Sequence, residues 1–155
     1  MLRSMAFALV LLICAAPFHV LAAGTDSGGS AAPNEVQQSK SLLKDGNYAK
    51  AEGLLRKALA DDPGNADAWN LLGYATRLQD NYEQAEEYYG KALAIDAKHV
   101  GAMQYLGMLY VKTGRTGEAK KLLARIDDAC FLSCSEYDDL KRAIETGKTD
   151  QDPGW

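Results

Sequence analysis

Apolar residues recur at helical spacing along most of the chain, in pairs of short segments that are separated by polar turns. In the middle of the chain the spacing holds over residues 69–76, breaks at the polar residues 79–81, and resumes over residues 85–92. Residues three to four positions apart share one face of an α-helix. Turn-forming residues recur at Asp45-Gly46-Asn47 and at Thr113-Gly114. The pattern therefore predicts an all-α protein built from helix-turn-helix units.

The helical pattern is itself repeated. From Ala32 the chain divides into three units of equal length, 32–65, 66–99 and 100–133, with matching residues at equivalent positions. Leu72-Gly73 matches Leu106-Gly107, Ala51 matches Ala85 and Ala119, Leu55 matches Tyr89 and Leu123, and Asn47-Tyr48 matches Asn81-Tyr82. Self-similarity at one fixed period indicates a repeat architecture.

Small residues predict where the two helices of a unit approach each other. Gly73 and Ala85 occupy equivalent places in the second unit to those of Gly107 and Ala119 in the third. A bulky side chain at such a position would push the helices apart, so we expect each glycine to face the second helix of its own unit.

The motif of the second unit resembles the tetratricopeptide repeat. Its pattern W-x2-L-G is formed by Trp69, Leu72 and Gly73, and alanine, tyrosine and alanine follow at positions 85, 89 and 92. The resemblance implies a right-handed α-solenoid of three repeats. The first unit departs from the pattern at residues 35, 38 and 39, as terminal repeats that face solvent do. A helix over 135–146 would cap the last repeat, which completes a repeat domain over 34–146.

The two ends of the chain differ in composition from the repeats. Residues 1–23 combine Arg3, an apolar run and small residues near Ala22 and Ala23, which predicts a signal peptide and export, with the periplasm as the expected compartment. The run is shorter than the roughly 20 residues of a spanning helix, so we expect no membrane span after cleavage. Residues 24–33 are small and polar and predict a flexible leader, and residues 147–155 predict a disordered tail.

Charge and motifs exclude several function classes. The net charge is −4 and the basic residues are not clustered, whereas nucleic-acid binding requires a basic surface. Phosphate loops, nucleophile elbows and zinc-protease motifs are absent from the sequence. His99, at the junction of the second and third units, is more readily explained as a polar residue at a helix start than as a catalytic base. We therefore expect a non-enzymatic module for protein-protein interaction, without cofactor or metal.

The resemblance also implies where a partner binds. In the tetratricopeptide fold the first helices of successive repeats line a concave groove, which here receives eight residues by position. They are Lys40, Lys44, Asn70, Tyr74, Arg77, Gln104, Met108 and Lys112. Four of these are basic in an acidic chain, so our hypothesis is an acidic peptide or protein partner. The alternative is that they are ordinary exposed residues.

Some members of the family hold a terminal carboxylate with a clamp of basic and amide side chains. Positions where that clamp would need lysine, asparagine or arginine hold Val36, Leu71, Gly101 and Tyr105 here. The resemblance therefore does not predict capture of that kind of terminus.

Two cysteines, Cys130 and Cys134, lie after the predicted signal peptide, at the junction of the third repeat and the capping helix. An even number of cysteines in an exported protein predicts a disulfide, which would fasten the cap to the repeat. The alternative is an active role, as a thiol-redox or soft-metal accessory protein, because thiolates favour both chemistries. The neighbouring residues are apolar or acidic, which favours the structural disulfide.

Overall fold

The computed structural model describes residues 31–130 and 134–149, so the predicted signal peptide, most of the leader and residues 150–155 lie outside the described chain. The described residues form seven α-helices and no strand. They are α1 (Ala31–Lys44), α2 (Tyr48–Asp61), α3 (Ala66–Arg77), α4 (Tyr82–Ile95), α5 (Val100–Lys112), α6 (Thr116–Ala129) and α7 (Ser135–Thr146). None of these seven has the length and hydropathy to cross a bilayer.

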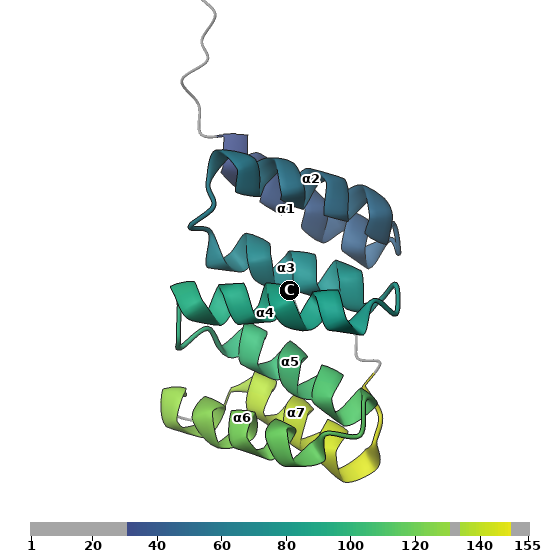
Figure 1. The fold of residues 1–155 in the computed structure, drawn as a ribbon, viewed down its shortest axis with the longest axis vertical. Helices are drawn as coiled ribbons and strands as arrows, with labels where there is room; N and C mark the ends of the chain where they lie inside the picture. The colour runs from purple at the N-terminus through teal and green to yellow at the C-terminus, as the bar shows by residue number, and fades with distance from the viewer. Residues whose placement is uncertain (1–30, 131–133, 150–155) are drawn as a thin grey trace, which may run out of the picture.

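The helices stack in chain order as antiparallel pairs, which gives the predicted all-α right-handed solenoid (Figure 1). Each pair is closed by a turn with one residue in the left-handed region: Gly46 at φ 73°, Asp80 at φ 62° and Gly114 at φ 78°. These three positions are equivalent in the three repeats. The repeat in the sequence is therefore also a repeat of backbone conformation, and only Asp80 adopts it without being glycine.

Helix starts repeat in the same way. The Asn65 side chain accepts a hydrogen bond of 2.9 Å from the Ala68 amide at the start of α3. The equivalent residue, His99, caps α5 by accepting a 3.1 Å bond from the Ala102 amide through Nδ1. Its Nε2 lies 3.0 Å from a carboxylate oxygen of Asp67. His99 is thus a capping residue that also joins two repeats.

The first helix begins earlier than the sequence suggested. α1 starts at Ala31, inside the segment assigned to the flexible leader, and Pro33 lies in its first turn, where a missing amide hydrogen is tolerated. Two residues that depart from the repeat pattern form polar contacts: Glu35 pairs with Lys57 of α2, and Ser39 donates a 2.7 Å hydrogen bond to the Val36 carbonyl. The bond from Lys57 holds the pKa of Glu35 below its usual value.

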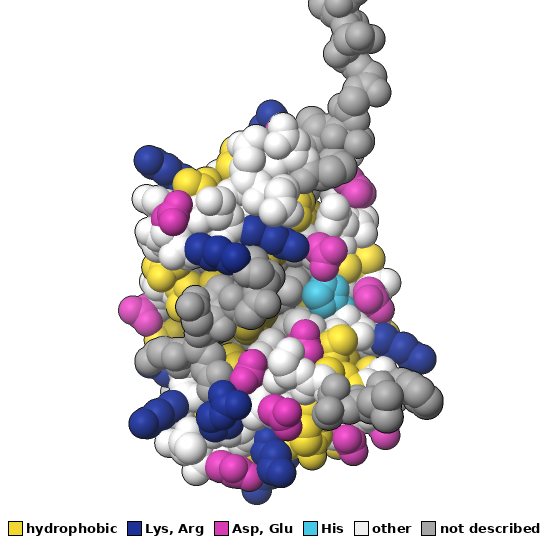
Figure 2. Space-filling model, turned by 180° about the vertical axis from the view of Figure 1, so that it is seen from behind, with side chains coloured by type: hydrophobic (Ala, Val, Ile, Leu, Met, Phe, Trp, Pro, Cys, Tyr) yellow, Lys and Arg dark blue, Asp and Glu magenta, His cyan; other side chains and the backbone are white. Residues whose placement is uncertain are grey.

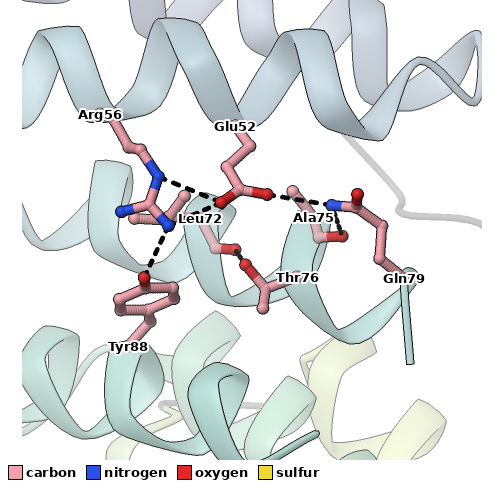
Figure 3. Close-up of polar contacts among 7 residues, drawn as sticks. All are labelled: Glu52, Arg56, Leu72, Ala75, Thr76, Gln79 and Tyr88. Atoms are coloured by element: carbon pink, nitrogen blue, oxygen red, sulfur yellow. Dashed lines mark hydrogen bonds and ion pairs between the residues drawn. The ribbon is translucent and has the colours of Figure 1, made fainter. Parts of the chain in front are cut away.

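Polar side chains connect successive repeats on the outer side of the stack. Glu52 of α2 accepts a 3.1 Å bond from Gln79 in the turn after α3, and Arg56 donates to Glu52 and, at 2.9 Å, to the Tyr88 hydroxyl (Figure 3). In the next repeat, Glu86 occupies the position of Glu52.

Glu86 makes the equivalent link between the second and third repeats. It accepts a 3.0 Å bond from the Tyr110 hydroxyl and lies 2.6 Å from the Arg115 guanidinium. The Arg115 bond lowers the pKa of Glu86 despite partial burial. Burial and the bond to Glu86 raise the pKa of Tyr110 to about 12.

The sequence predicted that Gly73 and Gly107 each face the second helix of their own pair, and this holds for Gly73 only. A methyl group added at Gly73 would lie 2.7 Å from the ring of Tyr89 in α4, within the same pair. At Gly107 the three nearest atoms would all belong to Leu140 of α7, the closest at 2.6 Å. Gly107 therefore lies where α7 packs on α5 through the fully buried Leu140, whereas the sequence had predicted contact with α6.

Candidate functional site

The first helices of the pairs and α7 share one face of the molecule, which Figure 2 shows from the front. Because each pair is antiparallel, α1, α3, α5 and α7 run in the same direction, and their carboxyl ends lie along one edge (Figure 1). Basic side chains lie just above the middle of this face, and both acidic and basic side chains lie below it (Figure 2). We call this face the groove.

The lower part of the groove holds a polar hollow of about 180 Å³ between α3, α5 and α7. Its lining residues are Asn70, Gly101, Gln104, Tyr105, Ser135, Glu136 and Asp139. Asp139 accepts a 3.1 Å bond from Gln104 and pairs with Arg142 at 3.0 Å, so its carboxylate is held by two partners. Acidic groups from α7 therefore close the lower end of the groove.

Buried aromatic rings lie beneath the middle of the groove. The rings of Tyr74 and Tyr105 lie 4.8 Å apart between centroids, and Tyr89 lies 6.3 Å from Tyr105. The guanidinium of Arg77 sits 5.3 Å from the centre of the Tyr74 ring, a cation-π distance. Burial raises the pKa values of Tyr89 and Tyr105 above the usual range, so both stay neutral hydroxyls.

Arg77 is the most unusual group on this face. The residue is 4% exposed, yet its Nε and Nη2 atoms have no hydrogen-bond acceptor. The guanidinium lies close enough to Tyr89 to oppose the rise in the pKa of that phenol, but the Tyr89 hydroxyl makes no hydrogen bond of acceptable geometry. A buried cation with unfilled donors is costly, because water no longer solvates it. The oxygen of the Asn70 amide is likewise buried without a donor.

The eight residues predicted to line the groove fall into two groups. Lys40 and Lys44 of α1 line a shallow hollow of about 380 Å³ with Gln37 and Ser41, and Lys112 is exposed at the end of α5. The other five are buried: Asn70, Tyr74, Arg77, Gln104 and Met108. Met108, at 1% exposed, packs in the hydrophobic core and offers no open contact surface.

Sequence reasoning missed the contribution of α7 and of Tyr105 to the groove. Tyr105 had been considered only as a departure from the carboxylate clamp, and α7 only as a cover. The sequence spacing contained the signal: Ser135 lies one repeat length after Gly101, and Asp139 lies one repeat length after Tyr105. α7 is therefore placed as the first helix of a next repeat would be, and its first turn lines the groove.

The two cysteines lie at the joint between α6 and α7. Cys130 ends α6 and Cys134 precedes α7, and the structure joins them by a disulfide with a Cα–Cα distance of 6.1 Å. Both are half-buried and pack against the core. Within the described ranges, no group of three or more His, Cys, Asp or Glu side chains is arranged to hold a metal.

Comparison with known proteins places this geometry in a family. Profiles described as Tetratricopeptide repeat match residues 36–100 and 77–144, so the second match extends into α7. The type IV pilus assembly protein PilF of Pseudomonas aeruginosa is 32% identical over 109 residues, which is 69% of this chain and 43% of that protein. The chain spans less than half the length of each curated relative that it matches.

Solved structures share the fold at lower identity. The first TPR of Spaghetti (RPAP3) bound to the HSP90 peptide SRMEEVD is 20% identical, with a TM-score of 0.67 over 76% of this chain and 92% of that chain. The Yersinia enterocolitica type III secretion chaperone SycD in complex with a peptide of the translocator YopD is 14% identical, with a TM-score of 0.66 over 78% and 92%. At these identities the two structures establish the fold alone. The chain belongs to the tetratricopeptide repeat family, with three repeats followed by α7.

Proposed function

We propose that this protein is a non-enzymatic adaptor or assembly factor that binds an acidic segment of a partner protein in the groove. Membership of the tetratricopeptide repeat family supports a protein-interaction module. The acidic preference, the use of the groove and the place of action go beyond that support. Two neighbours of the same fold are solved with peptides, which makes a peptide the natural first candidate for the partner segment.

The observation that carries the proposal is the state of Arg77. Its side chain is almost fully buried among tyrosine rings, and two of its nitrogen atoms have no acceptor. A carboxylate of a partner would accept both hydrogen bonds in a charge-assisted pair, which is stronger than a neutral hydrogen bond. Lys40, Lys44 and Lys112 would add longer-range attraction around that pair.

The proposal extends to the cell envelope as the place of action. The amino-terminal segment 1–23 has the features of a secretory signal, and a disulfide between Cys130 and Cys134 would be maintained in an oxidising compartment. Amino-terminal sequencing of the protein recovered from the envelope tests this part. A first residue near Gly24 supports export, and a chain that still begins at Met1 contradicts cleavage.

The experiment for partner binding compares three versions of residues 24–155 immobilised on a resin: wild type, Arg77→Gln and Arg125→Gln. Arg125 is exposed on α6, so its replacement makes the same change of charge away from the groove. We expect proteins from an envelope extract that bind wild type and Arg125→Gln, are reduced at least tenfold on Arg77→Gln, and elute as salt is raised. Equal capture by all three proteins would contradict the proposal.

Because Arg77 is buried, its replacement could also alter the fold. Circular dichroism of each variant, together with Arg77→Lys, separates the two effects. The lysine keeps the charge but loses the planar fork of donors, so we expect intermediate capture.

A further inference from the structure

The polar hollow between α3, α5 and α7, which we call the α7 hollow, has a lining that binding of an acidic segment does not explain. We propose that the α7 hollow binds the ammonium group of a lysine side chain carried by the partner protein. The inference rests on the proposed function in taking the groove to bind a partner segment, but it does not depend on the pairing at Arg77. It adds a second determinant, because the groove would then select a segment that carries a lysine beside its acidic residues.

The Asn70 side chain lies in the wall of the α7 hollow and lacks a donor. The residue is 6% exposed, and its Oδ1 atom accepts no hydrogen bond within the described chain. A buried amide oxygen without a donor is unfavourable, because it has lost water and gained no replacement. The amide lies beside Gly101, another residue of the lining, and a half-turn of the amide exchanges its oxygen and nitrogen. The unfilled acceptor therefore points to a ligand with N–H groups.

Two carboxylates of α7 line the same hollow. Asp139 is paired with Arg142, whereas Glu136 forms no ion pair within the described chain and accepts a 3.3 Å bond from the Ser135 hydroxyl. An acidic residue in the first turn interacts favourably with the helix dipole, which explains Glu136 by itself. It does not explain the unfilled acceptor on Asn70. The helix starts carry only a partial positive charge, so a full carboxylate charge outweighs it and the hollow attracts cations.

The size of the α7 hollow fits one side-chain head. Its volume of about 180 Å³ is below the range of about 300–1,000 Å³ that is typical of pockets for whole ligands. Gly101 keeps the space open, because a methyl group added there would lie 3.3 Å from the Asn70 amide nitrogen. A lysine ammonium, on its flexible four-carbon stem, reaches into such a space while the partner's backbone stays outside.

The acceptors favour lysine over arginine or a metal ion. They come from two helices, with an amide on α3 and carboxylates on α7. An ammonium has three rotatable donors that suit separate acceptors, whereas a guanidinium is a planar fork that suits a single carboxylate. A calcium ion takes about six to eight oxygen ligands. Within the described ranges, no group of three or more His, Cys, Asp or Glu side chains could hold a metal.

The test titrates the mature chain, residues 24–155, with Nα-acetyl-lysine amide and follows the side-chain amide signals of Asn70 by NMR. We expect saturable shifts in the low millimolar range, and none with Nα-acetyl-norleucine amide, which lacks the ammonium. Glu136→Gln should weaken binding about tenfold, as expected for loss of a charge-assisted hydrogen bond. Glu145→Gln, the same change at an exposed position of α7 outside the hollow, should leave the affinity unchanged. Equal affinity of wild type and Glu136→Gln overturns the inference.

Gly101→Ala tests the hollow without changing its charge. The added methyl group narrows the space beside Asn70. Alanine is also a better helix former than glycine, so we expect the variant to stay folded in thermal unfolding. Its affinity for Nα-acetyl-lysine amide should fall at least threefold. A folded Gly101→Ala protein that binds the probe as tightly as wild type would mean that the ammonium does not enter here, and the inference would be wrong.

Further titrations identify the cation. Nα-acetyl-arginine amide and glycine amide, whose ammonium has no stem, should each bind at least threefold more weakly than the lysine probe. Equal or tighter binding of either one overturns the assignment to lysine. Calcium chloride should leave the Asn70 signals unchanged, and displacement of the lysine probe by calcium would instead assign the hollow to a metal ion.

Partner capture separates this inference from the proposed function. On immobilised Glu136→Gln, capture of envelope proteins should fall at least threefold, and it should stay unchanged on Glu145→Gln. If it falls on Glu136→Gln while capture is indifferent to Arg77, the inference stands and the acidic preference fails. If capture depends on Arg77 and the lysine probe shifts no signal, the proposed function stands and the inference fails. Binding of the probe together with full capture on Glu136→Gln would show that the partner contributes no lysine here, which also overturns the inference.

Discussion

The second and third repeats carry a glycine at the same position but surround it differently. Gly73 faces the ring of Tyr89 in its own repeat, whereas Gly107 faces Leu140 of α7. In the third repeat the residue equivalent to Tyr89 is Leu123, whose shorter side chain is only partly buried. The Tyr89 ring fills the space at Gly73 from within the second repeat. The space at Gly107 is filled by α7, the helix that follows the third repeat.

The difference shows that repeated backbone geometry does not fix the packing partner. A glycine opens a space on its helix, and the size of the facing side chain decides which helix fills that space. The third repeat should therefore depend on α7 for stability more than the second repeat depends on any single neighbour outside it.

The largest effect is expected for Leu140→Ala. Leu140 is fully buried and is the side chain that fills the space at Gly107. Truncating a fully buried leucine costs about 3 kcal/mol of unfolding free energy, because packing is lost and a cavity remains. Urea denaturation measures the change. Ile144→Ala, at a half-buried position of the same helix, is the control and should cost clearly less. Equal losses of unfolding free energy would mean that the contact with Gly107 contributes no more to stability than an ordinary half-buried contact.

The next effect concerns the joint of α6 and α7. Replacing both Cys130 and Cys134 by serine should lower the unfolding free energy by about 2 kcal/mol, the entropic value for so short a loop. Thiol titration of freshly purified, unfolded protein comes first, and we expect no free thiol before reduction. If two thiols titrate without reductant, the bond is not formed in the protein and the serine pair should have almost no effect.

The glycines themselves give the direct comparison. Gly73→Ala should destabilise by about 1–2 kcal/mol, because its new methyl group meets the buried Tyr89 ring at 2.7 Å and overpacking outweighs the gain in helix propensity. Gly107→Ala should cost less, because the atoms it meets are the terminal methyl groups of Leu140, which can rotate. Thermal unfolding of both variants tests the order. A larger cost at Gly107 would show that the fully buried Leu140 side chain cannot move aside.

The fold was largely predictable because its determinants are local. Turn residues at 45–47 and 113–114, and the spacing around Leu72, set the helices and the period before any tertiary contact is considered. The start of α1 was not predicted, since the small and polar residues before Asn34 have no helical pattern. The partner of Gly107 was not predicted either, because it depends on the size of Leu123, a residue in another helix.

The groove was predictable only as a location. The family pattern names positions on the first helices, but it does not say which of them the fold buries. Arg77 and Lys112 looked alike in the sequence, yet the structure buries one without acceptors and leaves the other exposed. Glu136 and Asp139 became part of the groove through the docking of α7, which the repeat period indicates but the local helix pattern does not.

The smallest effect is expected at the link between the second and third repeats. Glu86→Gln weakens the pair with Arg115 and should cost about 0.5 kcal/mol at pH 7, since the pair is partly exposed and screened by solvent. The folded-state pKa of Glu86 is lowered, so its contribution is present above the unfolded pKa of about 4.3 and is lost as pH falls through the folded pKa. Urea midpoints of both proteins between pH 7 and pH 3 should therefore converge toward the acid end.

The control for this link is Glu118→Gln, which removes an exposed carboxylate paired with Lys121 within the same helix. That pair joins no two repeats, so its loss should be smaller and the third repeat should stay equally well attached. If the two variants lose the same stability and follow the same pH course, Glu86 is only a surface charge. The attachment of the third repeat to the second would then rest on the apolar packing of α5 against α3 and α4, with no measurable share from this ion pair.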